Sequence, residues 1–434
     1  MQLDALIQHL QEYLKSHTPP YLYNAGFSKA NPRVLYSGPY WDEKEILSAI
    51  TSLLTGDWLV AGEQVHQFET AFAKRFQVKH CHMVNSGSSA NLVLIAALKK
   101  RFNWADGDEI IVSPVGFPTT IAPIVQNNLK PVFVDIEYET LNFDVSRIPA
   151  LITPRTRAIF VSPVLGNPPD MDELLAICQS RKLLLVGDNC DSLGSRWNGR
   201  ELFSYYHASS CSFYPAHHIT TGEGGMICSD DQALIRLCVS LSWWGRDCHC
   251  VGAGNIHPEG RCRNRFAKWL PLYDGKIDHK YFFTNMGYNL KPLDLQGAIG
   301  LAQLEKFDLI HERRNHSKTM MDELFSRYIK GVRPVRAKEP AEPCWFGTPF
   351  ICDDKSVKDK LVEFLEKNHI QTRNYFAGNI LLHPAFEHLA DYRQFPNANA
   401  VLDQVFFVGA SPHYNQAVFD YIEELLKSKW TNPP

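Results

Sequence analysis

The feature that most constrains the fold of this chain is a series of short, mostly apolar runs that alternate with helical patterns. Four of them have the length and composition of buried strands: Glu109–Ser113, Pro131–Ile136, Ala158–Pro163 and Leu183–Asp188. Helical patterns lie between some of these runs, near Ser88–Lys100 and Asp170–Arg181. Strands that are apolar on both faces are typical of parallel sheets covered by helices on each side. The sequence therefore predicts an α/β protein with a mainly parallel sheet.

The pattern divides the chain into three parts. Residues 1–40 form an N-terminal arm that is rich in Tyr and Pro, and residues 41–291 form the large α/β domain. Residues 292–434 form a smaller α+β domain, with a long helical stretch, one strand-like run at Trp345–Cys352 and two further helices. Within the large domain, residues 243–281 are rich in Gly, Cys, His and Arg and have little periodicity. A long irregular segment of this kind is usually functional or disordered.

The composition excludes several classes of protein. With 44 basic and 47 acidic residues the net charge is -3, which leaves no electrostatic footprint for nucleic acid or an anionic membrane. No run approaches the roughly 18 apolar residues of a membrane span, and the first twenty residues lack a signal-peptide pattern. Eleven cysteines in such a chain indicate reduced thiols or metal ligands rather than a disulfide framework. We expect a soluble, cytoplasmic protein.

Three segments carry residues suited to binding or catalysis. Small and hydroxyl residues at Asn85–Asn91 precede a helical run, so they form either an anion-binding helix N-terminus or a plain helix cap. Asp188 ends a predicted strand, where it could hold a protonated ring nitrogen or a metal, or cap a turn. The third segment, Ser212–Gly225, contains a hydroxyl, an aromatic residue, two histidines and a Gly-rich turn.

Together these segments resemble the fold type I pyridoxal-phosphate enzymes of the DegT/DnrJ/StrS sugar aminotransferase family. The resemblance runs from about Trp41 to about residue 425 and includes VGFPTTIAPIVQNNLKPVFVDI, LGNPPDMDEL and MGYNLKPLDLQGAIGLAQLEK. It implies a mainly parallel seven-stranded sheet covered by helices, a smaller C-terminal α+β domain, and a homodimer with shared active sites.

One departure from the family pattern has direct chemical consequences. The family has a lysine that forms a Schiff base with the cofactor at the position where this chain has His217. Imidazole forms no stable imine, but it can act as a general base near neutral pH. Members with a histidine there are sugar 3-dehydrases that use pyridoxamine 5′-phosphate (PMP) bound non-covalently. The residues alone leave His218 open as the base, although the spacing to the Gly-rich turn favours His217.

The resemblance also assigns the cofactor contacts. It places Gly87, Ser88 and Ser212 at the cofactor phosphate, Asp188 at the ring nitrogen and Phe117 on the ring face, where a core position is the alternative for the phenylalanine. Asn289 matches an asparagine that reaches the phosphate bound by the neighbouring subunit. Two further residues are candidates for the sugar-nucleotide pocket, namely Arg373 and Asn379.

Four cysteines stand apart from the other seven. Cys190, Cys248, Cys250 and Cys262 have the spacing Cys-x57-Cys-x-Cys-x11-Cys, and four thiolates suit a 2Fe–2S cluster or a structural zinc ion. The resemblance to the CDP-sugar 3-dehydrases includes a four-cysteine 2Fe–2S motif, and the first three positions match it. The last gap is longer here, so Cys262 is the least well matched ligand.

The implied reaction is C3 deoxygenation of a nucleotide-linked 4-keto-6-deoxyhexose, such as CDP-4-keto-6-deoxyglucose, toward a 3,6-dideoxyhexose of a lipopolysaccharide O-antigen. Its electrons would come through the cluster from an NADH-dependent iron–sulfur flavoprotein reductase. Two alternatives remain. One is a cluster-free 3-dehydratase of the type that acts on GDP-4-keto-6-deoxymannose, and the other is a non-catalytic scaffold stabilised by zinc. An aminotransferase proper would require a lysine where His217 stands.

Overall fold

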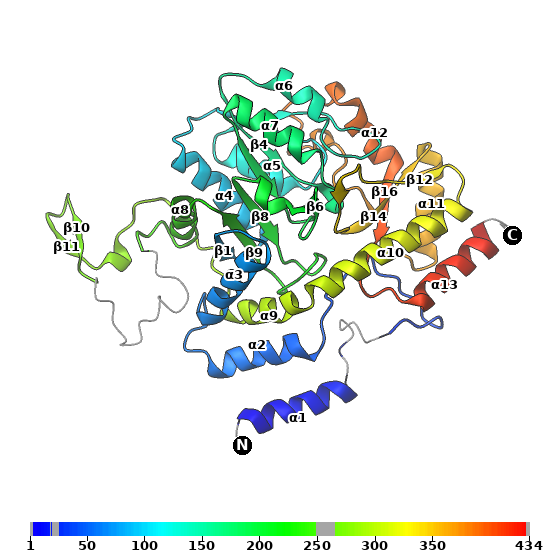
Figure 1. The fold of residues 1–434 in the computed structure, drawn as a ribbon, viewed down its shortest axis with the longest axis horizontal. Coiled ribbons are helices and arrows are strands. Elements are labelled where there is room, and N and C mark those ends of the chain that lie inside the picture. Colours follow the sequence, from blue (N-terminus) through cyan, green and yellow to red (C-terminus); the bar gives the residue numbers. More distant parts are fainter. Residues whose placement is uncertain (1–2, 18, 20–25, 249–264, 431–434) are drawn as a thin grey trace.

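The computed structural model describes residues 3–17, 19, 26–248 and 265–430 (Figure 1). Its central element is a seven-stranded sheet in the order β1-β9-β8-β5-β4-β2-β3. The pairs from β8 to β3 are parallel, whereas β9 runs antiparallel to both β8 and β1. The predicted mainly parallel sheet is therefore confirmed. In chain order its strands are β1 (His80–Val84), β2 (Glu109–Val112), β3 (Lys130–Phe133), β4 (Thr156–Val161), β5 (Leu184–Asp188), β8 (Ala208–Ser212) and β9 (Gly225–Ser229).

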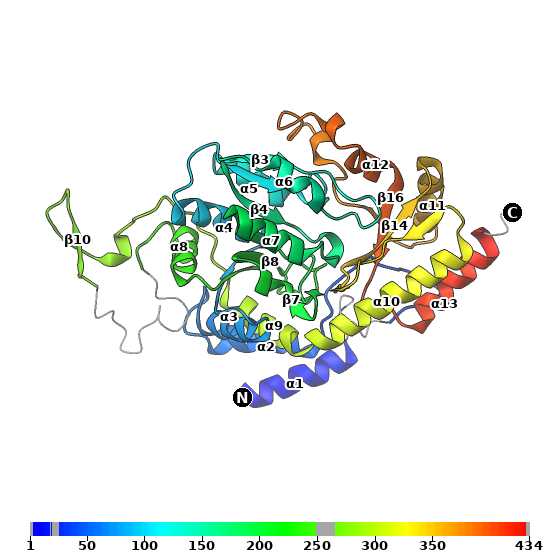
Figure 2. The same ribbon diagram turned by 45° about the horizontal axis from the view of Figure 1, so that its top comes forward.

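Both faces of this sheet are buried. Successive side chains of a strand point to opposite sides, so each strand contributes to a hydrophobic core on each face. Ile110 and Val112 of β2 pack into one hydrophobic core, and Ile111 packs into another. Helices cover each face (Figure 2), as the continuous apolar strands predict. The core that contains Ile110 is shared with α4 (Gly87–Arg101), α5 (Pro118–Gln126) and α8 (Gln232–Ser242), and the opposite face is covered by α3 (Glu63–Arg75) and α7 (Met171–Arg181).

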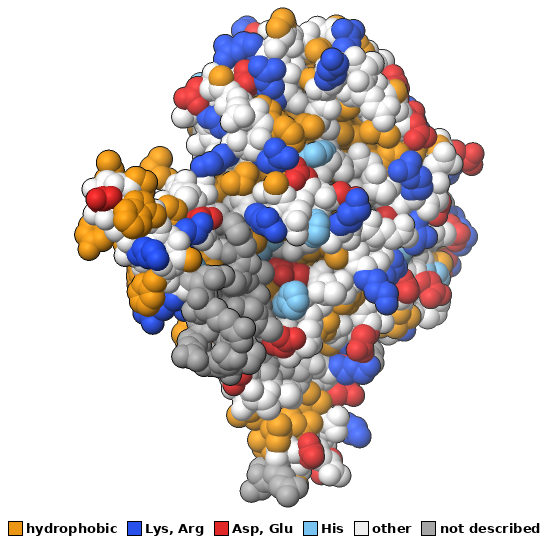
Figure 3. All heavy atoms as spheres, turned by 60° about the vertical axis from the view of Figure 1, so that its left-hand side comes forward, with side chains coloured by type: hydrophobic (Ala, Val, Ile, Leu, Met, Phe, Trp, Pro, Cys, Tyr) orange, Lys and Arg blue, Asp and Glu red, His pale blue; other side chains and the backbone are white. Residues whose placement is uncertain are grey.

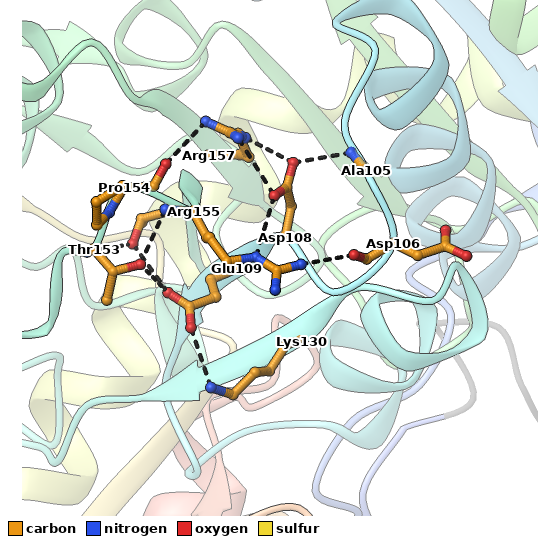
Figure 4. A network of polar contacts seen from close by, with 10 residues as sticks. Ala105, Asp106, Asp108, Glu109, Lys130, Thr153, Pro154, Arg155 and Arg157 are labelled. Atoms are coloured by element: carbon orange, nitrogen blue, oxygen red, sulfur yellow. Dashed lines mark hydrogen bonds and ion pairs between the residues drawn. The ribbon is translucent and has the colours of Figure 1, made fainter.

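A polar network occupies the amino-terminal edge of the sheet, where β2, β3 and β4 begin (Figure 4). Glu109 is paired with Lys130 at 3.1 Å and accepts a hydrogen bond from the Thr153 hydroxyl at 2.6 Å. Asp108 is paired with Arg157 at 2.8 Å. Every carboxylate of this group has a partner, so the network ties strand ends together. Asp188 lies at the other edge, at the carboxyl end of β5, where parallel sheets bind ligands.

A second sheet lies in the C-terminal part of the chain. It has four antiparallel strands in the order β12-β14-β16-β15, so the expectation of a single strand there was wrong. Two of these strands, β12 and β15, have only three residues each, and β16 follows directly on a helix. None of the three therefore gives a distinct sequence pattern. Their bounds are β12 (Val332–Pro334), β14 (Gly347–Cys352), β15 (Thr372–Asn374) and β16 (Val405–Gly409).

The long helical stretch predicted after Pro292 forms two helices, α9 (Asp294–Glu305) and α10 (Phe307–Tyr328). In Figure 1 α10 runs from the side of the large sheet to the small one. The remaining helices of the described chain are α1 (Leu3–Ser16), α2 (Glu43–Thr55), α6 (Ile148–Leu151), α11 (Lys355–Lys367), α12 (Pro396–Gln404) and α13 (Gln416–Leu425). None of the helices in the described ranges is both long and apolar enough to cross a bilayer.

Two smaller sheets complete the described part of the chain. Three two-residue strands form one of them, β6 (Arg196–Trp197), β7 (Arg200–Glu201) and β13 (Ala341–Glu342). The other is a hairpin of β10 (Lys268–Leu270) and β11 (Gly275–Ile277), which projects from the molecule on the left of Figure 1. It lies inside the segment 243–281 that was expected to be irregular, and residues 249–264 of that segment are outside the described ranges.

Candidate active site

A cavity of about 580 Å³ opens at the carboxyl ends of the parallel strands. Both parts of the molecule contribute to its wall, because Phe346 and Phe376 lie in the C-terminal part and the N-terminal segment adds Tyr36. The lining residues are Tyr36, Asn85, Ser86, Gly87, Ser88, Phe117, Thr119, Ser162, Asp188, Cys190, Asp191, Ser212, Tyr214, Ala216, His217, Glu223, Phe346 and Phe376. The sequence analysis singled out Gly87, Ser88, Phe117, Asp188, Cys190, Ser212 and His217 among them.

One end of the cavity is the N-terminus of α4. Ser86 caps the helix by accepting a hydrogen bond from the Ser89 amide at 3.1 Å, and the first amides of the helix have no acceptor within it. A Cβ atom on Gly87 would lie 2.4 Å from Cβ and 2.8 Å from Oγ of Ser212. The glycine therefore lets the helix end approach the Ser212 hydroxyl closely. Amide donors, a hydroxyl and the helix dipole together make a site for an anion.

Asp188 is a buried carboxylate that faces this cavity. Its Oδ2 accepts hydrogen bonds from Asn91 at 2.8 Å and Thr120 at 2.7 Å, and its Oδ1 accepts one from the Cys190 amide at 3.2 Å. These donors fix the carboxylate in position. No Lys, Arg or His forms an ion pair with Asp188 within the described ranges, so its charge is available to a cationic group in the cavity.

His217 lies on the wall of the cavity beside Asp191 and Phe346. Its Nδ1 is 3.6 Å from Oδ1 of Asp191 and has no hydrogen-bond partner among the described residues. Burial, together with the Arg314 guanidinium, lowers the pKa of His217 to about 3. Burial and the neighbouring Asp188 charge raise the pKa of Asp191 to about 7. The imidazole is therefore neutral at physiological pH, as a general base must be.

His218 has a different environment from its neighbour. It is 1% exposed, it is not among the described residues that line the cavity, and its Nε2 lies 2.8 Å from the carbonyl oxygen of Cys344. Burial lowers its pKa well below the usual range. Its ring is thus engaged in the protein interior, away from the cavity.

Aromatic side chains also line the cavity. The Phe117 side chain is 53% exposed and precedes α5, so it is no core residue. Its ring lies 6.2 Å from that of Phe376, and Tyr36 and Tyr214 add two phenols to the same cavity. Flat apolar surfaces of this kind suit the face of an aromatic or sugar ring.

Other predicted site residues lie elsewhere. Asn289 is exposed, accepts a hydrogen bond from Lys291, and does not line the cavity of its own chain. Arg373 stacks on the ring of Tyr36 at 4.1 Å, next to the cavity. Asn379 is fully buried and donates to the side chain of Asn399 at 2.7 Å. Contrary to the expectation, it is not among the described residues that line the cavity.

The structure describes two of the four predicted cysteine ligands. Cys190 lines the cavity, and Cys248 is half-buried just before the segment that is not described. Cys250 and Cys262 lie outside the described residues. Within the ranges that the structure describes, no group of three or more His, Cys, Asp or Glu side chains is placed to hold a metal ion.

Several functional candidates were missed from the sequence. Asp191 is next to Cys190 in the chain, and Tyr214 lies within the third motif, so a closer examination of those segments could have found them. Tyr36, Phe346 and Phe376 come from distant parts of the chain and carry no local signal. Only the packing of the N-terminal segment and the C-terminal part against the sheet brings them to the cavity.

Comparison with known proteins assigns this architecture. Residues 41–427 match the DegT/DnrJ/EryC1/StrS aminotransferase family. The chain belongs to this family. Within it, the chain is 39% identical over 433 residues to the dTDP-4-dehydro-2,6-dideoxy-D-glucose 3-dehydratase of Saccharopolyspora spinosa, covering 98% of this chain and 91% of that protein.

Two further relatives are informative. The chain is 34% identical to the lipopolysaccharide biosynthesis protein RfbH of Salmonella typhimurium, covering 96% of each protein. A solved structure of Escherichia coli GDP-4-keto-6-deoxy-D-mannose-3-dehydratase with bound hydrated pyridoxal phosphate is similar with a TM-score of 0.79 and 30% identity. The similarity covers 91% of this chain and 99% of that one.

The cofactor of DegT/DnrJ/EryC1/StrS proteins fits the cavity of this chain. The free helix N-terminus beside Ser212 suits a phosphate, and the buried Asp188 carboxylate suits a protonated ring nitrogen. No lysine is among the described residues that line the cavity, so none is placed there to link covalently to an aldehyde.

Proposed function

We propose that this protein is a PMP-dependent 3-dehydratase that removes the C3 hydroxyl of a nucleotide-linked 4-keto-deoxyhexose. The observation that carries the proposal is the set of residues that line the cavity. A neutral, buried imidazole, His217, faces a cavity whose described lining contains no lysine, and the same cavity holds the Asp188 carboxylate and an anion site. The 3-dehydratases among its relatives support the same reaction class.

Different residues of the cavity would contact different parts of the cofactor. When bound, PMP supplies an amine that can condense with the keto group and a ring that accepts electrons from the reacting carbons. The Asp188 carboxylate, fixed by Asn91 and Thr120, would hold the proton on the ring nitrogen. The Ser212 hydroxyl and the amides of Gly87 and Ser88 would bind the phosphate, and Phe117 would cover the face of the ring.

His217 acts as the base. Its Nδ1 is buried beside Asp191, so Nε2 would be the nitrogen that accepts a proton from the bound reactants. Because burial keeps the imidazole neutral, its ring nitrogen is unprotonated at physiological pH, as the starting state of a general base requires. The engagement of His218 with the Cys344 carbonyl supports this assignment over its neighbour.

The substrate class follows from relatives whose names differ in the nucleotide. A dTDP sugar is named for one of them and a GDP sugar for another. The common part is a 4-keto-deoxyhexose linked to a nucleoside diphosphate. We keep CDP-4-keto-6-deoxyglucose as the expected substrate, and a panel of CDP-, dTDP- and GDP-linked 4-keto-6-deoxyhexoses incubated with the PMP-loaded protein tests it. Loss of the C3 hydroxyl, followed by mass spectrometry, identifies the accepted nucleotide.

Substitutions at position 217 provide the decisive test. We expect His217→Asn to lose at least about 10²-fold in turnover, the usual contribution of a general base, while retaining PMP through gel filtration. His217→Lys should instead form a covalent link with pyridoxal phosphate that borohydride traps. His218→Asn is the matched control. Dehydration that persists in His217→Asn but disappears in His218→Asn would contradict the assignment.

We further propose that Cys190, Cys248, Cys250 and Cys262 bind a 2Fe–2S cluster that receives electrons from an NADH-dependent flavoprotein reductase. The position of Cys190 on the cavity wall supports it, because electrons would reach the substrate there. Anaerobic purification followed by iron and acid-labile sulfide analysis tests it. About two of each per chain, lost in Cys248→Ser, is expected for such a cluster. Turnover without iron and without a reductase would instead favour the cluster-free dehydratase, and zinc without turnover would favour the scaffold.

A homodimer with shared sites completes the proposal. Asn289 is exposed rather than in the cavity of its own chain, as a residue serving a second copy would be. The hairpin of β10 and β11 and the residue Phe266 shortly before it expose apolar side chains, which Figure 3 shows gathered on the projecting lobe, and these also include Trp269, Leu272 and Tyr273. Exposed apolar surface of this extent is typical of an interface.

A further inference from the structure

Arg314 is the largest side chain buried completely in the described protein, with 0% of its surface exposed. It lies on α10, the helix that runs from the large sheet to the small one (Figure 1). It forms no ion pair with a carboxylate within the described ranges. Burying a guanidinium without such a partner is costly unless its N–H groups find other acceptors.

The acceptors of Arg314 are four backbone carbonyls from three segments. Its Nη2 donates to the carbonyl oxygens of His217 at 2.8 Å and Ala216 at 3.1 Å. Its Nη1 donates to those of Phe346 at 3.1 Å and Ala410 at 3.4 Å. The planar fork of the guanidinium thus joins two consecutive carbonyls of the loop that carries the base to the ends of two strands of the small sheet.

Other contacts hold the loop on either side of these two carbonyls. The His217 amide donates to the Tyr214 carbonyl at 3.0 Å, the Ser37 hydroxyl donates to the Ala216 carbonyl at 2.6 Å, and the His218 ring lies 2.8 Å from the Cys344 carbonyl. Within the described residues, the His217 carbonyl itself is bound by Arg314. Phe346, whose carbonyl Arg314 also holds, has its ring 5.3 Å from the imidazole of His217. One side chain therefore fixes both the base and the wall against which it packs.

We propose that Arg314 is a positioning residue that aligns His217 for proton transfer by clamping the two carbonyls of its loop to the small sheet. The inference rests on the proposed role of His217 as base. An apolar side chain at this place would leave these buried carbonyls without the donors that the guanidinium supplies. The guanidinium also places a positive charge near the imidazole, which helps burial to keep it neutral.

The test compares Arg314→Met with Arg313→Met, the same substitution one residue earlier, where the arginine is exposed. Both variants are loaded with PMP and assayed with the accepted nucleotide sugar and with the NADH-dependent reductase as the source of electrons. We expect Arg314→Met to lower kcat by about 10²-fold, the cost of misplacing a catalytic group by about 1 Å, with little change in KM or PMP retention. Arg313→Met should behave as the parent protein.

Amide hydrogen exchange supplies a readout that does not depend on turnover. Exchange in Arg314→Met should accelerate in peptides covering residues 213–221 and remain at the parent rate in the core of the small domain. Acceleration throughout the small domain, or an Arg314→Met kcat equal to that of Arg313→Met, would overturn the proposal. His217→Asn is assayed in parallel, and full activity there would show that the proposed base, rather than the clamp, is wrong.

Two milder variants keep the test decisive if Arg314→Met does not fold. Arg314→Lys keeps the charge but cannot reach all four carbonyls, and Ser37→Ala removes a second donor to the Ala216 carbonyl. Both should accelerate exchange in residues 213–221 and lower kcat by less than Arg314→Met would. Parent-like exchange in both variants contradicts the clamp.

Discussion

Gly87 illustrates how a single residue determines whether the anion end of the cavity can form. A Cβ atom there would lie 2.4 Å from Cβ of Ser212 and 3.0 Å from Sγ of Cys190, so one of the two segments must shift. We expect Gly87→Ala to weaken PMP binding by at least about tenfold, or about 1.4 kcal/mol. A PMP titration followed by absorbance measures it. Gly38→Ala is the control, because a Cβ there meets nothing within 4 Å, and equal affinities would contradict the prediction.

The charge state of His217 provides a second test at this scale. Its pKa is lowered to about 3, so the folded protein keeps the imidazole neutral while free histidine, with a pKa near 6.5, becomes protonated as the pH falls. Diethyl pyrocarbonate modifies only neutral imidazole. We expect its rate with His217, mapped by mass spectrometry, to stay level from about pH 7.5 to pH 5, whereas N-acetylhistidine reacts more slowly at the acid end. A parallel decrease for His217 would show that its pKa is not lowered.

At the scale of elements, a buried carboxylate joins α2 to the α9–α10 pair. Glu45 is 0% exposed and accepts hydrogen bonds from Gln303 at 2.6 Å and Lys306 at 2.8 Å. Its loss removes an acceptor from the buried Gln303 amide and leaves Lys306 with only the Asp42 carboxylate, 2.7 Å away. We expect Glu45→Ala to lower the free energy of unfolding by about 1–3 kcal/mol, measured by urea denaturation.

An exposed ion pair between the same helices provides the control for that measurement. Lys44 and Glu305 are 3.3 Å apart, with side chains 59% and 66% exposed. Water and salt screen such a pair, so Glu305→Ala should change the stability little. If both variants lost a similar free energy of unfolding, the buried Glu45 carboxylate would contribute no more to stability than the exposed Glu305 does.

Element by element, the sequence predicted best where local signals agree. The strand Leu184–Asp188 and the helix α4 were located within a residue or two, because apolar runs and turn residues mark their ends. The small sheet was largely missed. Strands of three residues, such as β12 and β15, are held by pairing with β14 and β16 rather than by their own composition.

For the whole molecule, active-site complementation tests the shared-site homodimer. His217→Asn and Asn289→Ala each disable sites, but in different chains of a dimer if Asn289 serves the neighbouring subunit. We expect a mixture of the two inactive variants to regain turnover after unfolding and refolding together, because a mixed dimer then has one intact site. Each variant refolded alone is the control. No recovery, with a dimeric mass by light scattering, would place Asn289 in its own chain's site or outside any site.

What the sequence determined by itself is the chemistry that sits on consecutive residues. The alternation of strands and helices in the large domain, the small-residue helix start at Gly87, the carboxylate at the end of β5 and the histidine at position 217 all depend on short-range patterns that a linear chain displays directly. The tertiary structure decided the rest. Phe346 and Phe376 reach the cavity, and Arg314 reaches the carbonyl of His217, only through packing between segments about a hundred residues or more apart. Such contacts depend on burial and shape across the whole fold, for which no local pattern of residues is required.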